Sequence, residues 1–259
     1  MKGFYKGLAA ALLATAGVTI AAVPDGVAFL PPGFLSLIDV VPPAPIAQEP
    51  RGVADQEIFK LTRALKGSAR WDMAITDAAV DTASMMRGFA CAVRVEMTPQ
   101  TAPRTAALLE KASRDAAREA NELKGYYKKK PPFLLDSGET CASPPQGVEY
   151  GYPSDYATRG WTWGLVLGEA VDDRAAPIMA RARAYGESRI VCGMASMSAV
   201  EAGHMVASAT LAVVRTEPGY TTAMVAARAE LAALRKTGTA PSAQSCSAEE
   251  MLVSQPIFR

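Results

Sequence analysis

Histidine is almost absent from this sequence. The 259 residues contain one histidine, His204, and none of the cysteines form a C-x-x-C pair. Zinc sites are built from several Cys, His or acidic side chains at short spacings, so we expect no metal site. Any mechanism that needs two histidine side chains, one as a nucleophile or base and one as an acid, is excluded by the same count.

The sequence also has little net charge and few aromatic residues. Its 27 Lys and Arg residues against 26 Asp and Glu give a formal charge of +1, which offers no general attraction to nucleic acid or to an anionic membrane. Aromatic residues make up 7% and the alanine-rich runs are long, which favours closely packed helices over a β-sandwich. We therefore predict an all-α fold, a single-domain helical bundle.

Residues 1–22 have the pattern of a secretory signal peptide. Lys2 and Lys6 precede the apolar stretch 7–23, which ends in small residues and is followed by Pro24. The apolar stretch is shorter than the roughly 20 residues that span a bilayer, so cleavage is favoured over the alternative of a retained membrane anchor. The mature protein is expected to be periplasmic or secreted, without membrane contact.

The four cysteines are expected to form structural disulfides. They are Cys91, Cys141, Cys192 and Cys246. An exported protein meets oxidising conditions, so one or two bridges are expected, and four cysteines allow three pairings between which the sequence does not choose.

The rest of the chain divides into three parts. Residues 23–50 are a proline-rich lead-in, 51–237 a helical domain and 238–259 a polar C-terminal tail, of which we expect residues 238–247 to be mobile. The spacing of apolar residues predicts helices at 54–66, 74–88, 102–123, 155–170, 174–186, 195–214 and 219–236. Residues 131–153, rich in Pro, Gly and Ser, are predicted to form a long loop, and such loops are often functional.

Three stretches of this domain match known motifs in order and spacing. Residues 124–132 are similar to K-x6-R-P, residues 153–156 to P-S-G-H, and residues 188–199 to S-R-x5-H-x3-D. These patterns are typical of the class A non-specific acid phosphatases of the phosphatidic acid phosphatase (PAP2) superfamily, which the chain resembles over roughly residues 40–235.

The resemblance implies an all-helical domain in which the three motifs meet in one pocket. In that family the Lys, Arg and Ser side chains hold a phosphate, and one histidine, oriented by an aspartate, attacks phosphorus to form a phosphohistidine. A second histidine protonates the leaving alcohol. Carried over to this chain, the phosphate-binding residues are Lys124, Ser154 and Arg189.

Several positions depart from the family pattern. The motif arginine is Pro131, the glycine Asp155, the general-acid histidine Tyr156, the nucleophilic histidine Ala195 and the orienting aspartate Ala199. His204 lies nine residues beyond Ala195, about 13.5 Å further along a helix, so we expect it to be a packed helix residue without a catalytic role. Vanadium haloperoxidases share the pocket but bind vanadate through the nucleophile histidine, and Ala195 excludes this cofactor.

We therefore predict a periplasmic acid-phosphatase-like protein that has lost phosphohistidine-based hydrolysis. It keeps at most a weak phosphate site, which the carboxylate of Asp155 opposes by charge repulsion. Two alternatives remain open: residual or altered phosphomonoesterase activity, and a structural interaction protein of the cell envelope. The expected partners are phosphate or a small organic phosphate, and, because family members are commonly oligomeric, further copies of the chain.

Overall fold

The structure, a computed structural model, describes residues 28–144 and 147–258. Within these residues there are α-helices and two short 3-10 helices, η1 (Pro132–Leu134) and η2 (Asp172–Arg174), and no β-strand. The α-helices are α1 (Pro50–Arg63), α2 (Ala69–Thr76), α3 (Thr82–Val93), α4 (Pro103–Tyr127), α5 (Asp155–Ala170), α6 (Ala175–Val191), α7 (Met197–Val214), α8 (Pro218–Thr237) and α9 (Ala243–Ser254). The all-α prediction is confirmed, while the predicted signal peptide lies outside the described residues.

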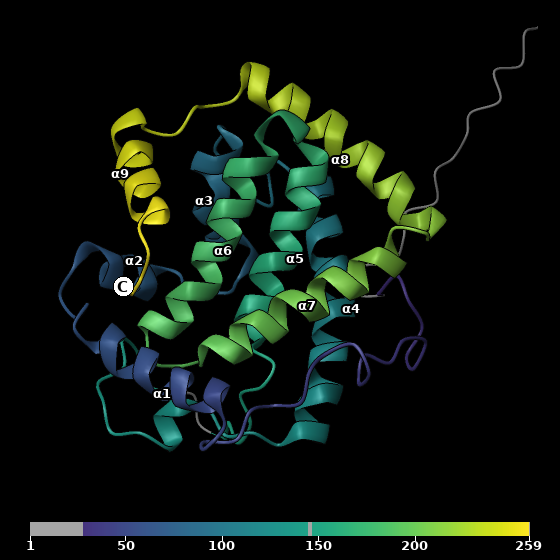
Figure 1. Cartoon of the computed structure of the whole chain (residues 1–259). Helices are drawn as coiled ribbons and strands as arrows, with labels where there is room; N and C mark the ends of the chain where they lie inside the picture. Colours follow the sequence, from purple (N-terminus) through teal and green to yellow (C-terminus); the bar gives the residue numbers. More distant parts are fainter. Residues whose placement is uncertain (1–27, 145–146, 259) are drawn as a thin grey trace, which may run out of the picture.

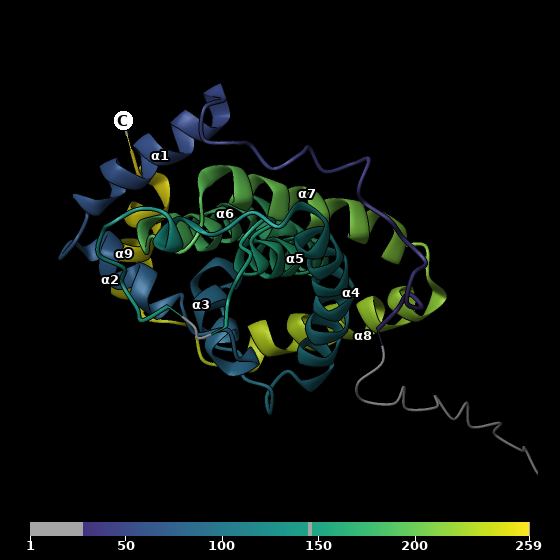
Figure 2. The same ribbon diagram turned by 90° about the horizontal axis from the view of Figure 1, so that it is seen from below.

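Helix α5 lies at the centre of the bundle. It packs most extensively against α6 and α7, and also against α4 and α8. Figure 1 shows α5 and α6 side by side in the middle of the molecule, and Figure 2 shows α4, α6 and α7 around α5. Among the described helices only α7 is long and apolar enough to cross a membrane, and 56% of it is buried in the protein.

Two glycines on α5 allow α6 to approach closely. A Cβ atom on Gly160 would lie 2.4 Å from the ring of Tyr185, and one on Gly164 would lie 2.4 Å from the Cβ of Ala182. Such distances are far below van der Waals contact, so a side chain at either glycine would push the helices apart. The two helices that carry the second and third motifs are thus held at a fixed, short separation.

Helix α4 forms one wall of the bundle through an apolar stripe. Pro103 occupies its first turn, where a missing N–H costs nothing. Buried apolar residues recur at three- and four-residue steps, with Leu108 beside them, and they are Ala106, Leu109, Ala112, Ala116, Ala120 and Leu123. The predicted helix is confirmed and continues to Tyr127, where Lys128 adopts a left-handed conformation with φ 49°.

The segment before α1 is fixed by side chains of α4. The buried carboxylate of Asp115 accepts hydrogen bonds from the backbone N–H groups of Phe29 and Leu30 at 2.8 and 3.0 Å. The hydroxyl of Tyr127 donates to the carbonyl of Val41 at 2.6 Å. A proline-rich segment has few backbone partners of its own, so these contacts satisfy groups that would otherwise be unpaired.

The single helix predicted at 74–88 is wrong. The structure has two helices there, because α2 ends at Thr76 and α3 begins at Thr82. The side chain of Asp81 accepts a hydrogen bond from the N–H of Ser84 at 2.9 Å and caps α3. An aspartate in this position favours a new helix start over continuation of the previous helix.

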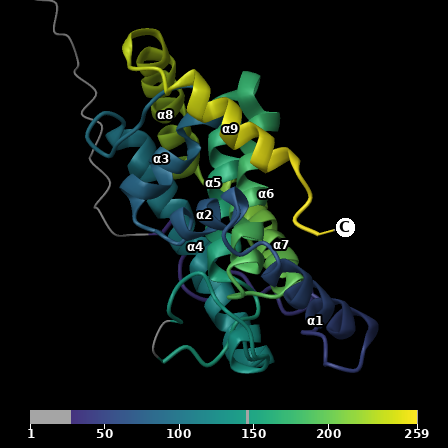
Figure 3. The same ribbon diagram turned by 90° about the vertical axis from the view of Figure 1, so that its left-hand side faces the viewer.

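The C-terminal segment differs from the mobile tail that we expected. Residues 243–254 form α9, and Cys246 within it is disulfide-bonded to Cys91 on α3. Figure 3 shows α9 along the outside of the bundle, where it packs against α6 and α3. The second bridge joins Cys141 in the long loop to Cys192 at the end of α6, so the structure selects one of the three pairings.

We predict that the double variant Cys91→Ser/Cys246→Ser is less stable than the parent by about 2–4 kcal/mol, because the bridge closes a long loop. The two cysteines are 155 residues apart, against 51 for the other pair. Urea unfolding monitored by circular dichroism measures the difference. Cys141→Ser/Cys192→Ser is the control, with a smaller expected loss, and an unchanged midpoint for the first variant would contradict the prediction.

Candidate functional site

The second motif is fixed at the start of α5. The hydroxyl oxygen of Ser154 caps this helix by accepting from the N–H of Ala157 at 3.4 Å. Tyr152, joined to Pro153 by a cis peptide, is fully buried and donates its hydroxyl to the carbonyl of Pro42 at 2.7 Å. Burial raises the pKa of Tyr152 to about 12, so this phenol stays neutral and anchors the motif.

The third motif is bound directly to the second. The backbone N–H of Ser154 donates to the carbonyl of Ala199 at 2.9 Å. Arg189 lies in the last turn of α6, and its carbonyl accepts from the N–H of Ala195 at 3.1 Å. The turn between α6 and α7 is thereby held against the first turn of α5.

The first motif reaches the same place from α4. Lys124, in the last turn of α4, forms an ion pair with the carboxylate of Asp155. Beyond the helix, the N–H of Gly151 donates to the carbonyl of Lys129 at 2.8 Å, and a Cβ on Gly151 would lie only 2.7 Å from the Cβ of Pro131. The structure therefore brings together the three motifs that the sequence singled out.

Arg189 lies beneath an aromatic ring. Its guanidinium carbon is 3.8 Å from the centre of the Tyr156 ring, a cation–π contact, and the residue is 4% exposed. One terminal nitrogen of this guanidinium has no hydrogen-bond partner among the described residues. Burial lowers the pKa of Arg189 from its usual value, but an arginine pKa is high enough for the group to remain charged at neutral pH.

Two alanines occupy the positions where the resemblance places the nucleophilic histidine and its aspartate. Ala195 is 5% and Ala199 2% exposed. Both pack in an apolar cluster with Val200 and Val191. A methyl group has no lone pair with which to attack phosphorus, so the side chains of Ala195 and Ala199 contribute to packing and take no part in a reaction.

A cavity of about 240 Å³ adjoins the motifs. It is lined by Val80, Ser113, Ala117, Asp155, Tyr156, Thr158 and Arg159. Neither Lys124, Ser154 nor Arg189 lines it, and Arg159 on its wall is ion-paired with Glu110. A second cavity of about 500 Å³ lies between the lead-in, α1 and residues 127–136, and the same three residues are absent from its lining.

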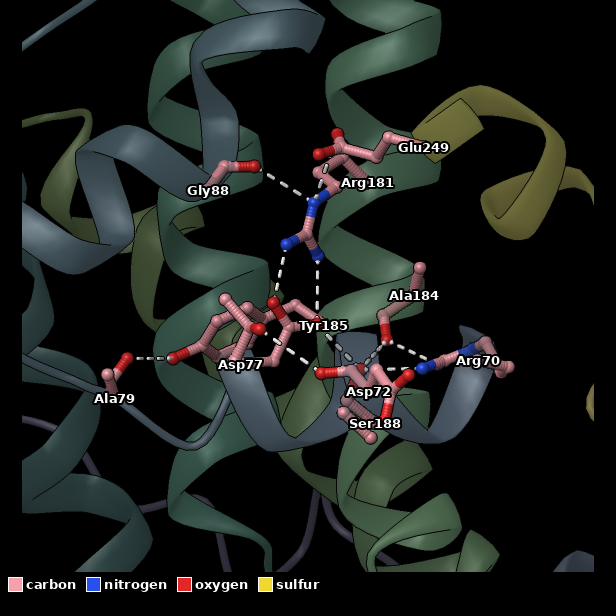
Figure 4. Close-up of polar contacts among 12 residues, drawn as sticks. Arg70, Asp72, Asp77, Ala79, Gly88, Arg181, Ala184, Tyr185, Ser188 and Glu249 are labelled. Atoms are coloured by element: carbon pink, nitrogen blue, oxygen red, sulfur yellow. Dashed lines mark hydrogen bonds and ion pairs between the residues drawn. The ribbon is translucent and has the colours of Figure 1, made fainter. Parts of the chain in front are cut away.

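Ser188 belongs to a buried ionic network (Figure 4). Its hydroxyl donates to Asp77 at 2.6 Å and accepts from Arg70 at 3.0 Å. Arg181 donates two hydrogen bonds to the carboxylate of Asp77, at 3.1 and 2.5 Å, and also contacts Glu249 of α9 at 3.3 Å. This motif serine thus holds α6 against α2, and it is not part of the cavity wall.

His204 lies on α7 with its ring stacked on Trp161, the centroids 4.2 Å apart. Its Nε2 atom is buried and has no hydrogen-bond partner among the described residues. Burial and, to a lesser degree, the positive charge of Arg183 lower the pKa of His204 to about 4. The imidazole is therefore neutral near pH 7 and packed between helices.

Sequence reasoning missed the ionic network around Ser188. Asp77 lies in the mainly apolar stretch 73–80, and a buried carboxylate in such surroundings needs a charged partner. That signal was available, but it did not identify Arg181, which is 104 residues away. Among residues 28–144 and 147–258, no group of three His, Cys, Asp or Glu side chains is placed to hold a metal ion.

Comparison with known proteins gives the family. No family model matches the sequence. An acid phosphatase of Zymomonas mobilis is 33% identical over 211 residues, which is 80% of each chain, and a non-specific acid phosphatase of Salmonella typhimurium is 31% identical over 74% of this chain and 78% of its own. The chain belongs to the class A non-specific acid phosphatase family. A non-specific acid phosphatase of Providencia stuartii is 28% identical over 76% of this chain and 81% of its own.

The match to the Zymomonas mobilis protein covers the site. A continuous match to 80% of the chain includes residues 124–199 wherever it begins. The match therefore spans all three motif segments, which the structure holds together through the contacts among α4, α5 and the turn between α6 and α7.

We predict that Asp77→Asn destabilises the protein by about 3–5 kcal/mol, because the buried Arg181 loses its buried charged partner and keeps only the more exposed Glu249. Chemical unfolding of the parent and the variant measures the change. Glu249→Gln removes the outer, 25% exposed partner of the same arginine and should cost much less. Equal losses in the two variants would show that the buried pair has no special role.

We predict that the imidazole of His204 titrates near pH 4 in the folded protein, against about 6.5 in the unfolded chain. As pH falls, the unfolded state therefore binds this proton first. The stabilisation is complete above about pH 6.5 and decreases by about 3 kcal/mol down to pH 4. NMR of a tag-free protein follows the single histidine directly, and a midpoint near 6.5 would refute the packed, neutral imidazole.

Proposed function

We propose that this member of the acid phosphatase family has lost phosphohistidine-based hydrolysis of phosphomonoesters and keeps at most a weak anion site. The observation that carries the proposal is Ala195, a buried methyl group at the position where the resemblance places the nucleophile. The proposed weak site consists of Lys124, Ser154 and Arg189. The proposal is supported by the pairing of Lys124 with Asp155 and the stacking of Tyr156 on Arg189, since both partners directly follow Ser154.

No neighbouring side chain replaces the missing chemistry. The Ser154 hydroxyl caps α5 and has no histidine beside it to take its proton. Asp155 is paired with Lys124, and the ring of Tyr156 is stacked on Arg189. The one histidine of the chain is stacked on Trp161 instead.

We propose a periplasmic or secreted location for the mature protein. The signal-like residues 1–22 support it, although they lie outside the described part of the structure. The two disulfides, Cys91–Cys246 and Cys141–Cys192, also support it, because such bonds persist in oxidising compartments.

Two other functions remain as alternatives. The names of the relatives favour a retained or altered acid phosphatase activity. A structural partner in the cell envelope is the third candidate, and it predicts no binding of small anions. Phosphate or a small organic phosphate as ligand, and self-association of the chain, stay predictions.

The test is an assay of the purified, disulfide-bonded protein with p-nitrophenyl phosphate between pH 4 and 8. We expect turnover far below the roughly 1–1,000 per second of ordinary enzymes. We also expect no labelled protein after an alkaline quench with a ³²P-labelled monoester, a condition under which a phosphohistidine would survive. Ordinary turnover that disappears in Lys124→Ala, or a trapped phosphoprotein, would overturn the proposal.

A repaired variant is the positive control. It carries Pro131→Arg, Asp155→Gly, Tyr156→His, Ala195→His and Ala199→Asp, and it should gain measurable hydrolysis and a phosphoprotein if the backbone of the site is intact. Folded but inert protein would count against the alignment. Thermal unfolding with phosphate tests the structural alternative, since a rise in Tm that is lost in Arg189→Ala requires a bound anion.

A further inference from the structure

The two cations of the candidate anion site are both occupied by other parts of the chain. Lys124 is paired with Asp155, and Arg189 is covered by the ring of Tyr156. We propose that Asp155 and Tyr156 determine the ligand specificity of this site by occupying the two cations that would bind a phosphate group, so that it rejects phosphomonoester dianions. The inference rests on the assignment of Lys124 and Arg189 under the proposed function.

Asp155 occupies the place of an anion in three respects. Its carboxylate forms an ion pair with the ammonium group of Lys124. The Lys124 side chain is only 17% exposed, so there is little space for a second anionic partner. As the first residue of α5 it also lies at the positive end of a helix, where a phosphate would otherwise be stabilised. Because the Asp155 carboxylate is part of the chain, its effective concentration at Lys124 is high, and a free anion must compete with it. A bound anion would also remain close to the negative charge of the displaced carboxylate.

Tyr156 separates Arg189 from the cavity. Tyr156 and Asp155 line the cavity of about 240 Å³, whereas Arg189 and Lys124 do not. Arg189 is 4% exposed, and one of its terminal nitrogens has no hydrogen-bond partner among the described residues. The guanidinium carbon of Arg189 is 3.8 Å from the centre of the Tyr156 ring. We infer that this ring takes the place that a phosphate ligand would have at the arginine, which leaves one donor without an acceptor.

The cavity wall offers no other available cation. Arg159 is the one cation on the wall, and it is ion-paired with Glu110, which also lies 4.0 Å from Arg114. A dianion in the cavity would therefore meet the exposed oxygens of Asp155 while Arg159 is engaged by Glu110, and its affinity depends on the removal of the Asp155 carboxylate.

The experiment measures phosphate binding to the mature, disulfide-bonded protein by isothermal titration calorimetry. Asp155→Asn keeps the shape of the side chain and frees Lys124, and a charge-assisted hydrogen bond changes affinity by about 10- to 100-fold. We expect a gain of that size, and we expect it to disappear in Asp155→Asn/Lys124→Ala. Asp155→Gly is a second variant with the same expected gain, should the asparagine form fold poorly.

Asp173→Asn is the matched control. Asp173 is 56% exposed and pairs with Arg235, which is 27% exposed, close to the 49% and 17% of Asp155 and Lys124. The substitution Asp173→Asn removes the same negative charge and frees Arg235, which lies outside the candidate site, so the phosphate affinity should not change. An equal gain in this control, or no gain in either Asp155 variant, would overturn the proposal.

Tyr156 is tested by Tyr156→Ala against Tyr156→Phe. Alanine uncovers Arg189 and should increase phosphate affinity at least about tenfold, whereas phenylalanine keeps the ring and should leave the affinity unchanged. Equal gains in both would assign the effect to the hydroxyl and refute the ring as the blocking group. Phosphatase turnover of the parent is scored separately: it decides the proposed function, and the affinity ratios decide the present inference.

Discussion

The close packing of α5 on α6 is the constraint on which the arrangement of this protein depends. Gly160 and Gly164 remove the side chains that would keep the two helices apart. The start of α5 carries Ser154 and its neighbours, and the end of α6 carries Arg189, so the separation of these helices sets the geometry of the whole site. The hydrogen bond from Ser154 to Ala199 then fixes the start of α7 to the same point.

The charges at this site are compensated within the chain. Lys124 has Asp155, Arg159 has Glu110, and Arg189 has the face of an aromatic ring. A phosphate-hydrolysing site instead keeps its donors free and oriented towards the place where charge develops. The compensation is consistent with the proposed loss of hydrolysis, because a scaffold without a substrate dianion is more stable when its buried cations are paired.

Much of the fold could be predicted from the sequence, because helix periodicity is a local property. The stripe from Ala106 to Leu123 in α4 is an example. The three motifs were identified by their resemblance to a known family in residue type, order and spacing. The helix break after Thr76 was missed although Asp81 is a good N-cap. Helix α9 was missed because its place depends on a bridge to Cys91 and on contacts with α6, which no local pattern contains.

The sequence by itself determined the helical class and the single histidine, and through its resemblance to the family it led us to expect alanines at two positions of the catalytic pattern. Only the tertiary structure decided that Asp155 pairs with Lys124, that Tyr156 covers Arg189, and which cysteines are joined. The physical reason is the range of the interactions. Helix formation depends on neighbours three or four residues away, whereas the Lys124–Asp155 pair joins residues 31 apart and exists only where α4 and α5 meet.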